Sequence, residues 1–154
     1  SEGMELRWDD VDLEGRTLRI ADTKNREPLT LPLSGFVHQI LENRYTAATS
    51  PFVFPGKTPA RPLTEPRPQM RHVTKTSGVE FTLHDLRRTF VTVAEGLDIP
   101  YYALKQLVNH KAAGDVTAGY IVTNVERLRE PMERVCNALL AAAGAKDAQA
   151  VEAG

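Results

Sequence analysis

The sequence predicts an α+β fold that is mostly α-helical, with a small three-stranded antiparallel sheet near the N-terminus. Residues 17–20 and 27–33 alternate apolar and polar side chains, as half-buried strands do. Beyond residue 34 the apolar side chains recur at helical spacing instead. With 154 residues, of which 42% are hydrophobic and 25% charged, the chain is long enough to bury a core as one domain.

Two turns join the three expected strands. Residues 6–8 resemble a helix end that leads into a short first strand around Val11, and residues 13–15 turn the chain into the second strand. Residues 23–25 have the composition of a hairpin turn between the second and third strands. This arrangement predicts Lys24 at the tip of the second hairpin.

Capping signals divide the rest of the chain into helices. Ser34 is expected to cap a helix whose apolar positions share one face, namely Phe36, Val37, Ile40 and Leu41. A Pro-rich, basic connector that reaches Pro68 is expected to be an exposed loop. Residues 69–77 then form a weak helix that ends at Gly78.

The clearest helix start is the capping-box pattern Thr82-Leu-His-Asp85, which predicts a helix that begins just after Thr82. The apolar residues of this helix are expected to face the core: Leu86, Phe90, Val93 and Leu97. His84 and Arg87 fall in its first turn, where side chains three positions apart share a side of the helix. The exposed N–H groups of a first turn also favour an anion.

Three segments complete the expected fold. Pro100 opens a short helix that reaches Val108, and residues 115–120 form a short turn or helix. The last helix carries a narrow apolar stripe: Val125, Leu128, Met132, Val135 and Leu139. Such a stripe suits packing on its own domain and docking on a neighbouring protomer equally well. Residues 141–154 are rich in Ala and Gly and are expected to form a flexible tail.

Charge is distributed unevenly along a chain whose net charge is −1. Residues 56–112 carry a net charge of +4, whereas residues 1–55 and 113–154 carry −3 and −2. A local basic surface is what a polyanion requires, although ordinary variation in a solvated surface produces the same pattern. The single cysteine, Cys136, favours a reducing compartment, and no apolar run is long enough to span a bilayer. We therefore expect a cytoplasmic protein with no membrane partner.

One ordered set of polar residues has the chemistry to move a phosphoryl group without a cofactor or a metal. It comprises His84, Arg87, Asn109-His110 and a late tyrosine, Tyr120. Histidine transfers protons near neutral pH, arginine braces two phosphate oxygens, and tyrosine can carry a phosphoryl group covalently. Taken singly, each of these residues has an ordinary structural interpretation, such as a helix cap or a packing residue. Their order and spacing together favour the functional interpretation.

These motifs resemble the catalytic domain of the tyrosine recombinases, especially the phage-type integrases. His84-Asp-Leu-Arg87 is similar to the family's His-x-x-Arg helix, and Leu107-Val-Asn-His110 to its Leu-Gly-His signature. Tyr120 follows at the expected distance, and Lys24 resembles the lysine on the family's β-hairpin. The resemblance covers residues 1–140 and implies the family's fold, with residues 141–154 as a tail.

The resemblance departs from the family pattern at two places. The stretch of Glu2, Leu6-Arg-Trp8 and Asp10 resembles the residues just after the family's first active-site arginine. That arginine would lie about two positions before Ser1, so the domain is expected to be truncated and to have little activity alone. At Asn109 the family has glycine, and asparagine tolerates the left-handed backbone conformation that glycine often supplies.

The resemblance implies roles for the five candidate catalytic residues. Tyr120 would attack a DNA phosphate and form a 3′-phosphotyrosyl link, while Lys24 would protonate the leaving 5′-oxygen. Arg87 and His110 would contact the phosphate. His84 would either accept the tyrosine proton or hold the phosphate, and both roles stay open. The candidate DNA-binding residues are all basic: Arg67, Arg71, Lys75, Arg88 and Lys111.

The same resemblance implies site-specific DNA recombination or integration. The partners would be double-stranded DNA and further copies of the chain in a tetramer, joined through residues 125–140. Two alternatives stay open. One is a non-catalytic DNA-binding or regulatory module with the same fold. The other is a type IB topoisomerase that relaxes DNA by the same chemistry.

Overall fold

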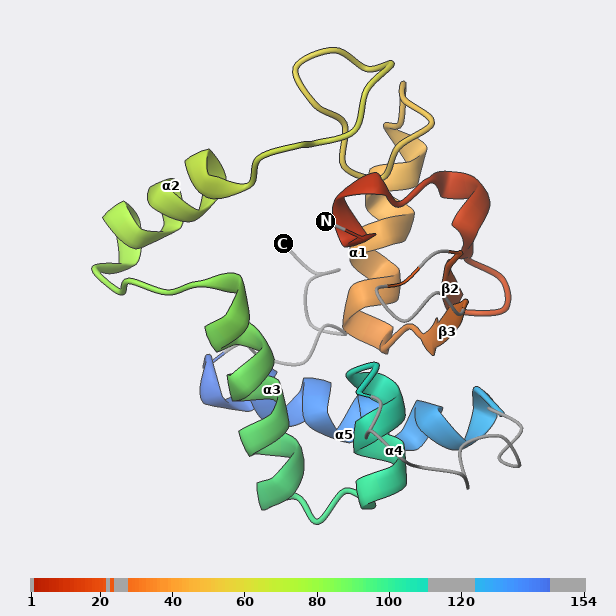
Figure 1. Ribbon diagram of the computed structural model, residues 1–154, viewed down its shortest axis with the longest axis vertical. Helices are drawn as coiled ribbons and strands as arrows, with labels where there is room; N and C mark the ends of the chain where they lie inside the picture. The colour runs from red at the N-terminus through yellow and green to blue at the C-terminus, as the bar shows by residue number, and fades with distance from the viewer. Residues whose placement is uncertain (1, 22, 24–27, 111–123, 145–154) are drawn as a thin grey trace, which may run out of the picture.

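A computed structural model describes residues 2–21, 23, 28–110 and 124–144 (Figure 1). It confirms an α+β fold in which helices predominate. Within these residues, two short 3-10 helices, η1 and η2, precede the sheet, and five α-helices follow it. In chain order the elements are η1 Glu2–Glu5, η2 Trp8–Asp10, β1 Val11–Asp12, β2 Thr17–Ile20, β3 Leu29–Pro32, α1 Gly35–Thr46, α2 Arg67–Ser77, α3 Leu83–Gly96, α4 Tyr101–Leu107 and α5 Glu126–Ala142.

The three strands form the predicted antiparallel sheet in the order β1-β2-β3. Leu18 in the central strand lies opposite Val11 on one side and Leu31 on the other. A small apolar core lies beside this sheet and contains Leu6, Leu33, Leu41 and Val53. The predicted hairpin tip at Lys24 lies outside the described residues.

Helix α1 begins where the sequence predicts, because the Ser34 hydroxyl accepts a hydrogen bond from the Val37 N–H at 3.4 Å. The prediction of one apolar face is only partly correct, since His38 and Leu41 are the buried residues of α1. The imidazole Nε2 of His38 donates to the Leu13 carbonyl at 2.8 Å, which turns this side of α1 toward the β1–β2 turn. Three apolar residues of the helix are therefore left exposed: Phe36, Val37 and Ile40.

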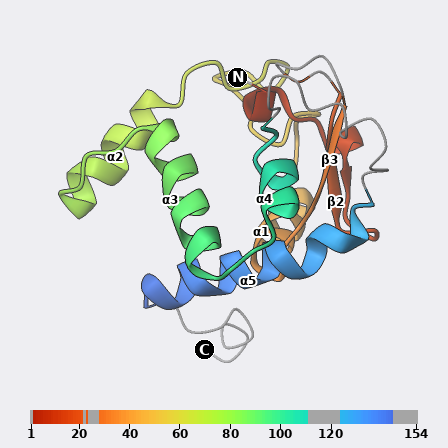
Figure 2. The same cartoon turned by 60° about the horizontal axis from the view of Figure 1, so that its bottom comes forward.

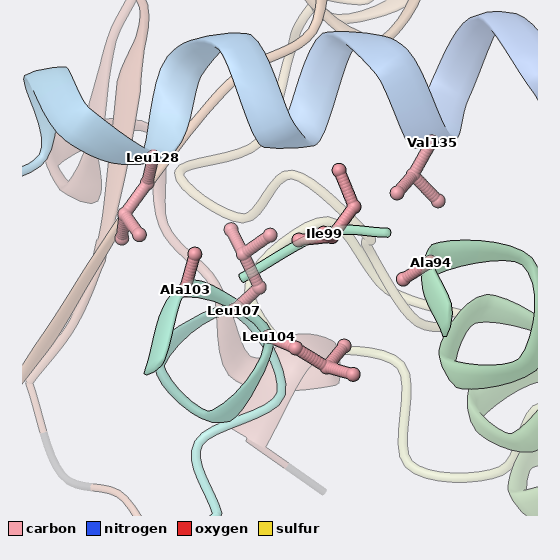
Figure 3. Packing of buried hydrophobic residues seen from close by; sticks show 7 residues of the cluster. All are labelled: Ala94, Ile99, Ala103, Leu104, Leu107, Leu128 and Val135. Carbon is pink, nitrogen blue, oxygen red and sulfur yellow. The ribbon is translucent and has the colours of Figure 1, made fainter. Parts of the chain in front are cut away.

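Helices α3 and α4 both pack against α5, and the main core lies among the three (Figure 3). Its buried members are Ala94, Ile99, Ala103, Leu104, Leu107, Leu128 and Val135. Figures 1 and 2 show that α3 runs toward the loop at residues 97–100 and that α4 runs back from it. The first turn of α3 and the last turn of α4 consequently lie at the same end of a helical hairpin.

The apolar stripe of α5 packs on its own domain, which is one of the two fates that the sequence left open. Leu128 and Val135 are buried, and Met132 and Leu139 pack partly buried against the same core. Polar contacts fix the helix further. Arg129 donates to carbonyls of the β1–β2 turn at 2.8 and 3.1 Å, and Arg134 donates to the carbonyl at the end of α3 at 2.6 Å. Glu133 accepts from the first N–H of α1 at 2.9 Å.

Two predictions about the helical half need correction. Helix α2 begins at Arg67 rather than at residue 69. Pro68 fits in the first turn, because a backbone N–H at that position would have no hydrogen-bond partner within the helix and proline has none to lose. Leu86 was expected in the core but is 52% exposed. It lies near the N-terminal end of α3, beyond the part of this helix that reaches α5; Phe90, Val93 and Leu97 do pack against the core as predicted.

Helix α2 stands apart from the rest of the molecule (Figures 1 and 2) and has no buried residue. It ends as predicted at Gly78, whose φ of 74° is the left-handed conformation that favours glycine. Within the described residues, no helix has the length and apolar character needed to cross a membrane.

Candidate active site

The predicted capping box at the start of α3 is present. The Thr82 hydroxyl accepts a hydrogen bond from the Asp85 N–H at 3.2 Å. In return, the Asp85 carboxylate accepts hydrogen bonds from the Thr82 N–H at 2.9 Å and from the Thr82 hydroxyl at 2.6 Å. These bonds make Thr82 the N-cap and place His84 and Arg87 in the first one and a half turns, both exposed to solvent.

The capping box also determines the charge of Asp85. Hydrogen bonds from the Thr82 hydroxyl and N–H hold the pKa of Asp85 below its ordinary value, and the positive charge of Arg88 acts in the same direction. An ordinary aspartate is already ionised at neutral pH, and these contacts extend the ionised range of Asp85 to lower pH. Its contribution to the cap is present above the ordinary carboxyl pKa of about 3.9 and is lost as the pH falls through the lowered pKa.

His84, Arg87 and His110 are available to bind a ligand. In the described part of the chain, none of these three side chains takes part in a hydrogen bond or an ion pair. A guanidinium without a carboxylate partner, at the electropositive end of a helix, is well suited to contact phosphate oxygens at two points. His110 follows α4, whose last turn lies at the same end of the α3–α4 hairpin as the first turn of α3 (Figures 1 and 2).

A Schellman motif at the end of α4 positions His110. The His110 N–H donates to the Lys105 carbonyl at 2.9 Å, and the Asn109 N–H donates to the Gln106 carbonyl at 3.1 Å. Asn109 adopts a φ of 50°, which is the left-handed conformation expected at a position where the resembling family has glycine. Asparagine tolerates this conformation better than most residues because its short polar side chain can bond locally.

The backbone at Asn109 leads to a testable expectation. Asn109→Gly should change the free energy of unfolding by less than about 1 kcal/mol, because glycine adopts positive φ freely. Asn109→Val should cost about 1 to 3 kcal/mol, because a β-branched residue is strained in that region. Urea denaturation of the two variants measures both values. Equal stability of the two would contradict a left-handed conformation at this position.

The candidate DNA-binding residues of α2 lie on one side of that helix. Arg67, Arg71 and Lys75 are four positions apart and exposed, so their cations form a row. Arg67 pairs with Glu65 at 3.6 Å, and an exposed pair of this kind contributes little energy. Lys57 and Arg61 on the connector are two further exposed cations. They were not among the predicted DNA-binding residues, although they contribute to the positive charge of residues 56–112.

Three of the predicted site residues lie outside the described part of the chain: Lys24, Tyr120 and Lys111. The structure brings His84 and Arg87 together on one helix and carries His110 to the same end of the hairpin. Arg88 follows Arg87 on α3 and is exposed. Across residues 2–21, 23, 28–110 and 124–144, no three His, Cys, Asp or Glu side chains gather as a metal site would require.

Two comparisons with known proteins show what this chain is similar to. The family model described as "Phage integrase family" matches residues 1–127. The prophage integrase IntF of Escherichia coli (strain K12) is 29% identical over 148 residues, a match that covers 90% of this chain. The chain spans only 31% of the length of that relative.

Proposed function

Because the chain belongs to the phage integrase family, we propose that it is a catalytic domain for site-specific DNA recombination or integration. The single observation that carries this proposal is the pair His84 and Arg87, exposed and unpaired in the described structure, on the first turns of α3. The left-handed Asn109 carries His110 to the same end of the hairpin. Histidine can transfer a proton and arginine can stabilise charge on phosphate oxygens, and a reaction at a phosphodiester uses both functions.

In the proposed reaction the Tyr120 hydroxyl oxygen attacks the phosphorus of one DNA phosphodiester. The P–O3′ bond is retained and the P–O5′ bond breaks, so a 3′-phosphotyrosyl link and a free 5′-hydroxyl result. The tyrosine proton goes to a base, and the leaving 5′-oxygen takes a proton from an acid, for which Lys24 is the candidate. Attack by the 5′-hydroxyl of a partner strand reverses the step, and no high-energy cofactor is consumed because the ester is conserved.

Arg87 and His110 stabilise the negative charge of the five-coordinate phosphorus in the transition state. His84 either accepts the tyrosine proton or holds the phosphate. Tyrosine needs this help because its ordinary pKa is about 10, so its hydroxyl is a weak nucleophile at neutral pH.

The row of cations on α2 is proposed to contact the DNA backbone. Arg71 and Lys75 are exposed, and the helix stands apart from the body of the protein (Figure 1), so a duplex can approach it. Arg88 and Lys111 are proposed to bind phosphates near the reacting one. A tetramer on DNA is also proposed. Because the apolar stripe of α5 is already packed on its own domain, contacts between subunits would use other side chains of residues 125–140.

A nicked suicide DNA substrate tests the nucleophile. The complete gene product that carries this chain is used, because the chain spans only 31% of the length of its relative. We expect a covalent protein–DNA adduct on a denaturing gel, and we expect Tyr120→Phe to abolish it. Tyr101→Phe is the matched control, since Tyr101 is exposed on α4 and should leave the adduct unchanged.

Other outcomes would identify the alternatives. DNA binding by the native protein with no adduct would favour a non-catalytic DNA-binding module. An adduct accompanied by relaxation of supercoiled DNA, but never by exchange of strands, would favour topoisomerase-like chemistry. An adduct that persists in Tyr120→Phe would show that a different residue is the nucleophile.

A further inference from the structure

The first turn of α3 has little tertiary support in the described structure. Leu83 and Leu86 are 54% and 52% exposed, and the only buried residue of the helix is Ala94, near its other end. Helix α2 precedes α3 in the chain and buries none of its residues against it. Side-chain packing among the described residues therefore does not hold the turn that carries His84 and Arg87.

The capping box supplies the constraint that packing does not. It closes both ends of the first turn, since the Thr82 side chain bonds the Asp85 N–H and the Asp85 carboxylate bonds the Thr82 N–H. His84 lies inside this closed turn, between the two residues of the box. Uncapped helix ends fray, and fraying would let the imidazole move away from the guanidinium.

The carboxylate of Asp85 is placed so that it does not oppose an anion. It is hydrogen-bonded to Thr82. It also faces Arg88, which lies three positions further along the helix on the same side. His84 and Arg87 are each one position before these residues, so their side lies about 100° around the helix. A phosphate held by His84 and Arg87 therefore meets an imidazole and a guanidinium, while the carboxylate of Asp85 lies on another side of the helix.

We propose that Thr82 and Asp85 are positioning residues for the DNA strand-cleavage step. They hold the first turn of α3 so that His84 and Arg87 face one phosphate together. This inference rests on the proposed function of the site. It assigns neither residue a contact with DNA.

The test compares Thr82→Val, Thr82→Ser and Ser34→Ala in the complete gene product. Ser34→Ala is the matched control, because it also removes an N-cap side chain, but from α1 beside the sheet. Single-turnover cleavage of the suicide substrate is measured at saturating protein, together with DNA affinity and the midpoint of thermal unfolding.

Loss of a cap that holds the reacting groups should slow cleavage by about 5- to 30-fold in Thr82→Val, with DNA affinity within about twofold of the native value. Thr82→Ser keeps the hydroxyl and should cleave within about twofold of the native rate. Ser34→Ala should lower the unfolding midpoint without slowing cleavage. Amide hydrogen exchange at residues 84–87 should become faster in Thr82→Val alone.

Two results would overturn the inference. One is a Thr82→Val protein that cleaves no more slowly than Ser34→Ala, which would reduce the box to an ordinary stabilising cap. The other is unchanged hydrogen exchange at residues 84–87, which would show that something else holds the turn. Failure of the native protein to form any adduct would instead refute the proposed function, and the inference with it.

Discussion

Arg87→Ala is expected to slow DNA strand cleavage by about 10²- to 10³-fold, because a preorganised donor to the transition-state charge is lost. Arg87 is exposed and has no hydrogen bond or ion pair within the described residues, so its removal breaks no structural contact seen there. The midpoint of thermal unfolding should consequently be almost unchanged. The rate is measured by single-turnover adduct formation on the suicide substrate at saturating protein.

Arg87→Lys separates charge from geometry at the same position. Lysine keeps the positive charge but cannot contact two phosphate oxygens with a planar fork, so most of the loss in rate should persist. Arg19→Ala is the control, because Arg19 is an exposed cation on β2 of the sheet. This variant should cleave DNA within about twofold of the native rate. A native rate in Arg87→Ala would remove this arginine from the active site.

Local signals in the sequence predicted the helix ends well. Ser34, Gly78 and Thr82 all cap the helices that the sequence assigned to them, because a cap depends on side chains and backbone within a few residues. Asn109 was expected to tolerate a left-handed backbone for the same kind of local reason, and it adopts one. The part of the candidate site that lies on α3 and α4 follows from these caps.

Burial was less predictable, because it depends on which elements meet. Leu86 has the helical spacing of a core residue, yet α3 meets α5 only toward its C-terminal part. Phe36, Val37 and Ile40 share apolar character with Leu41, but the hydrogen bond from His38 to Leu13 helps to decide which side of α1 turns inward. The packing of α5 was likewise undecidable from its stripe, since the same spacing serves an internal core and an intermolecular groove.

Leu128→Ala tests that packing, and it should lower the free energy of unfolding by about 2 to 5 kcal/mol. Leu128 is 2% exposed and reaches from α5 toward Ala103 and Leu107 of α4 (Figure 3). Truncating it removes apolar contact and leaves a cavity between two helices that the rest of the core holds in place. Urea denaturation of the 154-residue chain measures the loss.

Leu86→Ala is the matched control, because it deletes the same atoms from a leucine that is 52% exposed. It should change the free energy of unfolding by no more than about 0.5 kcal/mol. A small effect of Leu128→Ala would mean that α5 is not held on its own domain in solution, and its apolar stripe would then be free to dock on a neighbouring protomer. The ratio of the two effects thus decides between the two fates of α5, because the substitution is chemically identical at both positions.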